Sequence, residues 1–253
     1  ICLSGYPTMN KQEYRNIFEH EAEHFFYVAN NNLYLSYIKN LTEKRKSMSI
    51  LDVGCGAGYL AKQMAKYAHV QGVDMHPQAL LYSRKRGLAV KKASVTKLPY
   101  KNNSFDVVTC IDVLCHKSIK NDRIAFAELS RIIKPGGFLI VRVPALPLLF
   151  SRHDKYVETR ERYSKAKFKK RLLSAGFMIK KLSYINFVLF LPALIKVLIE
   201  RNRKNKDHMS VITNINPVLN AVARYILTLD NVAMKLVSLP IGNGLFAVVQ
   251  KPK

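Results

Sequence analysis

Three glycines at alternate positions, Gly54, Gly56 and Gly58, follow directly after a short apolar run. Glycine has no Cβ, so it adopts positive φ angles and lets a ligand approach the backbone closely. The helical pattern over 59–68, which opens at Tyr59, would present free N–H groups to a polar or anionic ligand. This stretch therefore predicts a strand, a tight turn and a helix start that bind a polar group. The alternative is a structural turn without a ligand.

Two aspartates are placed to act on such a ligand. Asp52 lies on the predicted strand just before the glycines, and Asp74 ends a second apolar strand. An acid at the tip of the second strand can bind both hydroxyls of a ribose. No Gly-Lys-Ser/Thr follows the glycines, which excludes a P-loop, and the spacing G-x-G-x-G differs from the G-x-G-x-x-G of dinucleotide-binding enzymes.

Together with two later stretches, this pattern resembles a known family. Residues 98–106 read LPYKNNSFD and residues 134–137 read KPGG, a turn that leads into an apolar strand. The chain, from about residue 13, resembles the type 11 group of class I S-adenosylmethionine (SAM)-dependent methyltransferases. The resemblance implies an α/β fold, with a Rossmann-like seven-stranded sheet, flanking helices and SAM as the cofactor. The cofactor contacts that it implies are Asp52, Gly54, Cys55, Gly56, Gly58, Asp74, Met75, Ser94, Val95, Ile111 and Asp112.

The resemblance also assigns roles within this set. Asp74 would hold the ribose, Asp52 would orient the turn, and Ile111 with Asp112 would line the methionine end. Ser94 stands where the family usually has an aspartate that accepts a hydrogen bond from the adenine amine. A neutral hydroxyl makes a weaker bond than a carboxylate, so we expect reduced cofactor affinity.

A histidine follows the fourth expected strand. Residues 112–116 read DVLCH, where the family has D-V-L-E-H, so that Cys115 replaces a glutamate. His116 is the candidate general base, a role that contributes roughly 10²–10⁴-fold to a rate. Its alternative is a structural, hydrogen-bonded histidine. Asn-Pro-Pro-Tyr and Asp-Pro-Pro-Tyr are absent after this strand, which argues against N-methylation of a nucleobase.

The acceptor pocket is expected from the resemblance at the loop after the fifth strand and at an aromatic segment near the N-terminus. Thr159 and Glu161 depart from the family's His and Arg in this loop. The guanidinium of Arg162 could bind a carboxylate or phosphate, or form a structural salt bridge. The candidate substrate-binding residues are Phe26, His153, Asp154, Arg162 and Tyr163.

Composition limits the class of protein. The 253 residues can bury one core, so one domain with insertions is expected. The formal net charge of +24 predicts attraction to anionic surfaces, or else a solvated lysine-rich surface. Four cysteines without a C-x-x-C pair indicate reduced thiols of a cytoplasmic protein rather than a zinc site. The chain begins at Ile1 rather than Met, which indicates either a fragment or a mis-called start; in the second case Met9 is the expected start, because patterned sequence begins just after it.

The pattern along the chain suggests four parts. Residues 1–47 form a helical lead-in or lid, with one helical stretch over 10–47, and 48–186 form the SAM-binding core. Residues 187–240 form a helical, apolar and basic insertion, and 241–253 supply the last strand, which is expected over 244–250. The apolar run at 187–199 is too short and interrupted for a membrane span. It would form either a cap packed over the acceptor pocket or a segment lying in the bilayer interface beside a basic cluster at 201–206.

The expected function is methyl transfer from SAM to a small-molecule or lipid-like acceptor, in a protein that is peripheral to an anionic membrane or free of it. Two alternatives remain. The departures at Ser94, Cys115, Thr159 and Glu161 would suit a methyltransferase fold kept as a binding or scaffold module. The charge alone would suit an RNA methyltransferase, although no added RNA-binding motif is present. The sequence does not identify the acceptor or the oligomeric state.

Overall fold

The computed structural model describes residues 11–43, 47–202 and 215–253. The expected start at Met9, the thiol of Cys2 and the basic positions 203–206 lie outside these ranges.

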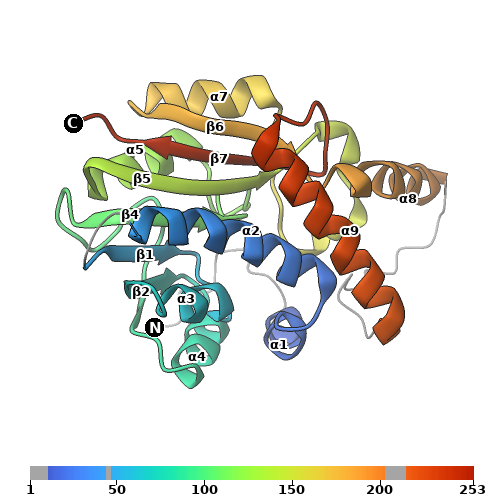
Figure 1. Ribbon diagram of the computed structural model, residues 1–253, viewed down its shortest axis with the longest axis horizontal. Helices are drawn as coiled ribbons and strands as arrows, with labels where there is room; N and C mark the ends of the chain where they lie inside the picture. Colours follow the sequence, from blue (N-terminus) through green and yellow to red (C-terminus); the bar gives the residue numbers. More distant parts are fainter. Residues whose placement is uncertain (1–10, 44–46, 203–214) are drawn as a thin grey trace.

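One mixed sheet organises the chain (Figure 1). Its strand order is β3-β2-β1-β4-β5-β7-β6, and only β7 runs antiparallel to its neighbours. This is the seven-stranded Rossmann-like arrangement that the sequence predicted. The strands are β1 (Ser49–Val53), β2 (His69–Asp74), β3 (Val90–Lys92), β4 (Phe105–Ile111), β5 (Ile133–Pro144), β6 (Met178–Ile185) and β7 (Gly244–Gln250).

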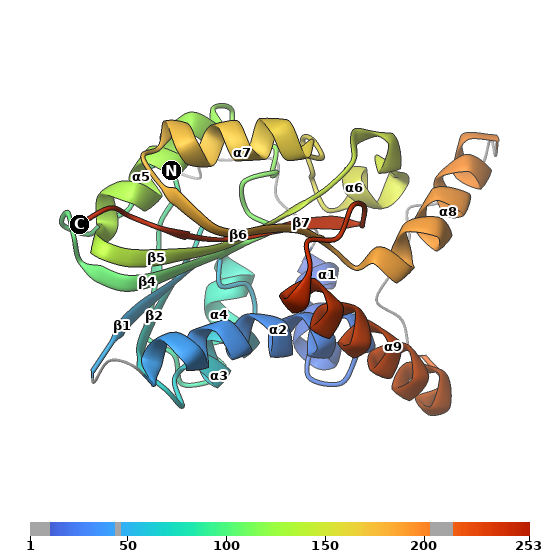
Figure 2. The same ribbon diagram turned by 45° about the horizontal axis from the view of Figure 1, so that its top comes forward.

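Helices cover both faces of the sheet, with α5 and α7 on one side and α2, α3 and α4 on the other (Figure 2). Both faces of β1 and β4 are therefore buried, which explains why these parallel strands read as continuous apolar runs. The helices are α1 (Lys11–His20), α2 (Phe25–Thr42), α3 (Tyr59–Met64), α4 (Pro77–Lys85), α5 (Asp122–Ile132), α6 (Arg152–Tyr156), α7 (Lys165–Ser174), α8 (Phe190–Asn202) and α9 (Pro217–Leu236), with 3₁₀ turns η1 (Pro147–Leu149) and η2 (Phe187–Leu189).

Two expected boundaries were wrong. The single helix expected over 10–47 is divided by a turn at 21–24, after which the ring of His24 caps α2 by accepting the Phe26 N–H at 3.3 Å. The helix expected over 59–68 ends at Met64. In both places the apolar pattern continues through a turn, so periodicity alone did not mark the end.

The insertion forms α8 and α9. Helix α9 packs against α2, and the side chain of Asn231 donates to the carbonyl of Ala29 at 2.9 Å. Much of its apolar surface nevertheless faces solvent, and the cap expected from the run 187–199 stays a prediction. Within the described ranges, no helix combines the length and the apolar character that crossing a bilayer requires.

Candidate functional site

The glycine turn joins β1 to α3 at the carboxyl edge of the sheet. Gly54, Gly56 and Gly58 all have positive φ, of 72°, 55° and 86°. A Cβ on Gly54 would lie 2.1 Å from Cγ2 of Val113, whereas a Cβ on Gly56 would meet no atom within 4 Å. Gly54 is therefore required for packing, and Gly56 leaves the backbone open toward a ligand.

Asp74 ends β2 beside this turn. Its carboxylate accepts the Gly56 N–H at 3.0 Å and the His76 N–H at 2.8 Å. Burial raises the pKa of Asp74, and these two N–H groups oppose the rise. A carboxylate offers about four acceptor sites, so capacity remains for a ligand hydroxyl.

Ser83 on α4 fixes the turn from the other side, a role that the sequence did not suggest. Its hydroxyl donates to the Gly56 carbonyl at 3.0 Å and lies 3.6 Å from Sγ of Cys55. The Cys55 thiol is buried, and burial raises its pKa strongly. Cys55 thus packs beneath the turn rather than presenting a reactive thiolate.

Asp52 lies below the turn in the core. It is 3% exposed and accepts a 2.6 Å hydrogen bond from the Thr109 hydroxyl on β4. Burial raises the pKa of Asp52 to about 6, while the bond from Thr109 opposes this and the charge of Asp74 adds to it. This contact links β1 to β4 directly beneath the glycines.

Helix α1 covers the Asp74 end of the turn. The ring of Tyr14 stacks on His76 with centroids 4.2 Å apart. Burial, with the nearby charge of Asp74, raises the pKa of Tyr14. A buried ion pair between Glu21 and Arg86 attaches the end of α1 to α4, and Arg86 also donates to the carbonyl of Phe18 at 3.0 Å. The N-terminal segment therefore lies over the predicted ribose site.

The remaining predicted cofactor residues lie around the same edge with different exposures. Met75 is 42% exposed and Val95 is buried, while Ile111 is partly buried at the end of β4. The hydroxyl of Ser94 accepts the Thr96 N–H at 3.2 Å and lies 2.8 Å from Oγ1 of Thr96. Part of its acceptor capacity is thus already used within its own turn.

His116 follows β4 on a loop that pairs with Thr159. Its Nδ1 accepts the Ser118 N–H at 3.1 Å and lies 2.8 Å from the Ser118 hydroxyl. Burial lowers the pKa of His116, so the neutral ring is favoured. Nδ1 therefore has a structural role, and Nε2 is the nitrogen left for proton transfer.

Asp112 and Arg142 form an ion pair where β4 and β5 end. The side chain of Arg142 is 6% exposed and that of Asp112 is 39% exposed. The guanidinium lies 5.3 Å from the ring centre of Phe26, at the start of α2. Arg142 was missed in the sequence, although a lone arginine inside the apolar run 138–143 is a visible signal. This pair and Phe26 therefore lie at the edge of the sheet beside the glycine turn, where Val113, the neighbour of Asp112, packs on Gly54.

Three of the loop residues proposed for the acceptor, Asp154, Arg162 and Tyr163, are engaged with the protein itself. Arg162 donates through Nε to both carboxylate oxygens of Asp154 at 3.0 Å, and through a terminal nitrogen to Asn243 at 2.8 Å. Tyr163 is fully buried and donates to Asp122 at 2.8 Å. These contacts are those of the structural alternative.

His153 lies on α6 next to Asp154. Burial lowers the pKa of His153 to about 4, and Asp154 opposes this shift. Its ring is thus neutral at pH 7.

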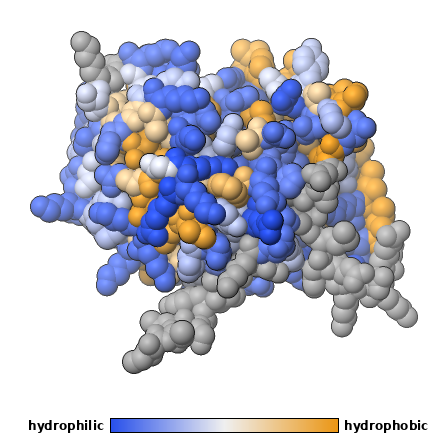
Figure 3. All heavy atoms as spheres, turned by 90° about the horizontal axis from the view of Figure 1, so that it is seen from below, coloured by the Kyte–Doolittle hydropathy of each residue, from blue (hydrophilic) through white to orange (hydrophobic). Residues whose placement is uncertain are grey.

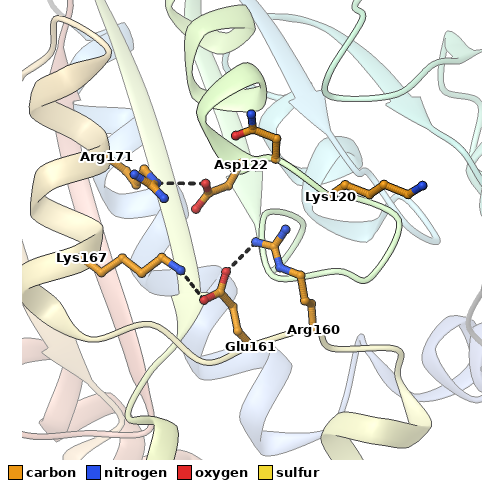
Figure 4. Close-up of a pocket in the computed structure, with 7 residues that line it drawn as sticks. Lys120, Asp122, Arg160, Glu161, Lys167 and Arg171 are labelled. Atoms are coloured by element: carbon orange, nitrogen blue, oxygen red, sulfur yellow. Dashed lines mark hydrogen bonds and ion pairs between the residues drawn. The ribbon is translucent and has the colours of Figure 1, made fainter.

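A separate pocket of about 340 Å³ lies between α5, α7 and residues 160–161. Figure 4 shows Glu161 between Lys167 and Arg160, and Arg171 paired with Asp122. The acidic and basic side chains that line this pocket pair with one another. They form an ion-pair network that joins α5, α7 and residues 160–161. It does not contain the glycine turn or Asp74.

The residues at the sheet edge fit SAM. An open glycine backbone, a carboxylate with spare acceptor capacity and a covering aromatic helix suit a nucleoside with a ribose. Gly54, Gly56, Gly58 and Asp74 would hold it.

Comparison with known proteins agrees with this edge. Residues 51–141 match the family profile described as "Methyltransferase domain". A probable tRNA methyltransferase 9B of Bos taurus is 28% identical over 169 residues, covering 66% of this chain and 37% of that protein. A ubiquinone biosynthesis O-methyltransferase of Alkalilimnicola ehrlichii is 32% identical over 149 residues, covering 50% of this chain and 60% of that protein. The chain thus spans less than two thirds of either relative.

A solved structure shares the fold across nearly the whole chain. It is a complex between the Trm112 methyltransferase activator of Haloferax volcanii and a putative methyltransferase. The TM-score is 0.60 at 16% identity, with 96% of this chain and 94% of that chain covered.

Proposed function

We propose that the chain is a class I SAM-dependent methyltransferase, which transfers a methyl group from SAM to a small-molecule or lipid-like acceptor. The observation that carries the proposal is the Gly54–Gly58 turn with the Asp74 carboxylate beside it. Bound SAM supplies an activated methyl group, so the protein needs no covalent nucleophile of its own. Its task is to align the acceptor with the methyl group. Such positioning can lower the barrier by roughly 7–11 kcal/mol.

The protein's own groups divide this task. Asp74 and the turn bind and orient the cofactor, and α1 excludes water from the ribose end. His116, neutral at pH 7, takes a proton from the acceptor through Nε2. The pair Asp112–Arg142, with Phe26, forms the acceptor side, because these residues lie beyond β4 and β5 at the same sheet edge.

An apolar acceptor is favoured by the insertion. Helices α8 and α9 place many apolar side chains at the surface, and α9 binds through Asn220 to Phe25, the neighbour of Phe26. The relative that acts in ubiquinone biosynthesis is consistent with such an acceptor. We therefore propose a lipid-like acceptor and a peripheral location at a membrane.

A second candidate is an RNA acceptor. It is favoured by the formal charge of +24 and by the relative named as a probable tRNA methyltransferase.

One experiment separates these acceptors. The protein is incubated with methyl-labelled SAM and, in parallel, with a total lipid extract, a pool of polar metabolites or total tRNA. We expect label in the organic phase, and much less of it with Asp74→Asn at a limiting concentration of SAM. Label in tRNA alone would support the second candidate. Absence of label in all three, with cofactor binding intact, would contradict the acceptor classes proposed here.

A further inference from the structure

Helix α9 has two faces of different character. Its inner face is attached to α2, where Asn220 accepts the Phe25 N–H at 2.8 Å and donates to the carbonyl of Glu23 at 2.9 Å. Leu227 and Met234 are buried on the same side. These contacts hold α9 against α2, so the opposite face of the helix points away from α2.

The outer face of α9 is apolar along its length. Its members are each about half exposed or more, from 48% at Val232 to 81% at Leu236. They recur every three or four residues, which places them on one stripe of the helix. A helix of 20 residues is about 30 Å long. The stripe consists of Val218, Val222, Tyr225, Leu229, Val232 and Leu236.

Helix α8 extends the apolar surface at the same end of the molecule. Leu191, Ile195 and Leu198 are 59%, 49% and 49% exposed. In Figure 3, orange spheres gather at the right-hand edge, the end at which Figure 1 places α8 and α9. A continuous exposed apolar surface of this kind marks a surface that contacts a partner.

The charges on these helices identify the partner. In the described parts of α8 and α9, the exposed charged side chains are cationic: Lys196, Arg201, Arg224 and Lys235. The two acids are engaged with the protein, and Glu200 also lies 3.8 Å from Nζ of Lys196. Glu200 binds the backbone N–H of Arg152 at 2.9 Å, and Asp230 is 7% exposed and binds the Phe187 N–H at 2.8 Å.

We propose that the α8–α9 surface lies in the interface of an anionic phospholipid bilayer. Apolar side chains would enter the acyl boundary while the flanking cations meet lipid phosphates, which is the pattern of interfacial helices. Pairing with a second copy is disfavoured, because it would bring cations together without exposed acids on these helices to pair with them. The inference deepens the proposed function, because a lipid-like acceptor would be reached from the bilayer. It can nevertheless be tested without cofactor or acceptor.

The test measures flotation of the protein with vesicles of phosphatidylcholine alone or with phosphatidylglycerol. We expect binding to the anionic vesicles that weakens with salt. Val222→Glu with Leu229→Glu should abolish it, because charged side chains do not enter the acyl boundary. Leu173→Glu with Ile124→Glu is the matched control, since these leucine and isoleucine side chains are equally exposed, at 51% and 50%, on α7 and α5. The control should bind like the parent.

The cations are tested separately. Arg224→Gln and Lys235→Gln should each weaken vesicle binding about fivefold. Lys169→Gln and Lys170→Gln on α7 are the controls. If all four variants weaken binding to the same extent, vesicle binding depends on net charge alone, and the assignment to this surface is overturned.

Two further results would overturn the inference. One is failure of the parent to bind anionic vesicles; the other is a dimer in light scattering that the Val222→Glu and Leu229→Glu changes separate. SAM binding is measured on the same samples. Intact SAM binding with no vesicle binding rejects the membrane surface alone, and vesicle binding without SAM binding rejects the proposed function alone.

Discussion

The carboxylate of Asp74 accepts the backbone N–H of Gly56 at 3.0 Å, which joins the tip of β2 to the middle of the glycine turn. One side chain therefore fixes the shape of the turn and remains available to a ligand hydroxyl. The two motifs that were separate in the sequence act as one unit at the edge of the sheet.

Asp74→Asn removes the charge and keeps the size of the side chain. Hydrogen bonds to a charged group are worth roughly 1.5–3 kcal/mol, so SAM affinity should fall about 10- to 100-fold. Calorimetric titration measures the change. Glu19→Gln, on the exposed side of α1, should leave affinity unaltered. Equal affinities in parent and Asp74→Asn would remove Asp74 from the site.

The glycines should differ in what they do. Gly54→Ala clashes with Val113 and should unfold the turn, and adding Val113→Ala should restore part of the stability. Gly56→Ala should cost only the roughly 1–2 kcal/mol of a left-handed residue, yet block the cofactor. Gly87→Ala, also at positive φ in open space, is the control that retains cofactor binding. Thermal unfolding and SAM titration of all four proteins separate packing from binding.

The cover over the site should depend on one ion pair. Arg86→Ala removes the partner of Glu21 and the bond to Phe18, so α1 should detach more often. We expect faster hydrogen exchange over 11–20 and release of SAM about tenfold faster, since roughly 1.4 kcal/mol corresponds to tenfold. Arg84→Ala, on the exposed face of α4, should change neither. Unchanged exchange in Arg86→Ala would show that α1 is held by other contacts.

Much of the sheet could be predicted because its signals are local. The strand 244–250 was predicted to the residue, since a glycine starts it and its apolar run is uninterrupted. The division between α1 and α2 was missed, because His24 caps through a ring nitrogen, and histidine is not among the common caps. Asp74 could be found from strand position alone. Ser83 and Tyr14 could not, because their roles come from partners that lie far away in the chain. Arg142 stands out as a lone arginine in an apolar run, but its pairing with Asp112 could not be predicted.

Protonation of His116 should set the pH below which the rate of methyl transfer falls. Burial lowers the pKa of His116, so the ring becomes protonated, and useless as a base, only below its ordinary range. Methyl transfer to the lipid extract should therefore be constant near pH 7 and fall as the pH drops below about 6.5. His116→Gln should lower the rate roughly 10²–10⁴-fold while SAM affinity is retained. A variant with the parent's rate and pH profile would leave His116 with its structural role only.

Removing Asp112 should destabilise the protein more than removing Arg142, its partner in the ion pair. Asp112→Ala leaves the buried guanidinium without its counter-charge, a change that typically costs about 3–5 kcal/mol. Arg142→Met leaves only a partly exposed carboxylate, which water can solvate, so the loss of stability should be smaller. Denaturant unfolding of both variants compares the two costs. A larger loss in Arg142→Met would contradict this assignment of burial.

Calorimetric titration of the unaltered protein with SAM, S-adenosylhomocysteine and NAD tests the central claim most directly. We predict binding of the first two in the micromolar range, with one site per chain, and no binding of NAD. Absence of SAM and S-adenosylhomocysteine binding would contradict the claim and leave a methyltransferase fold used for another purpose.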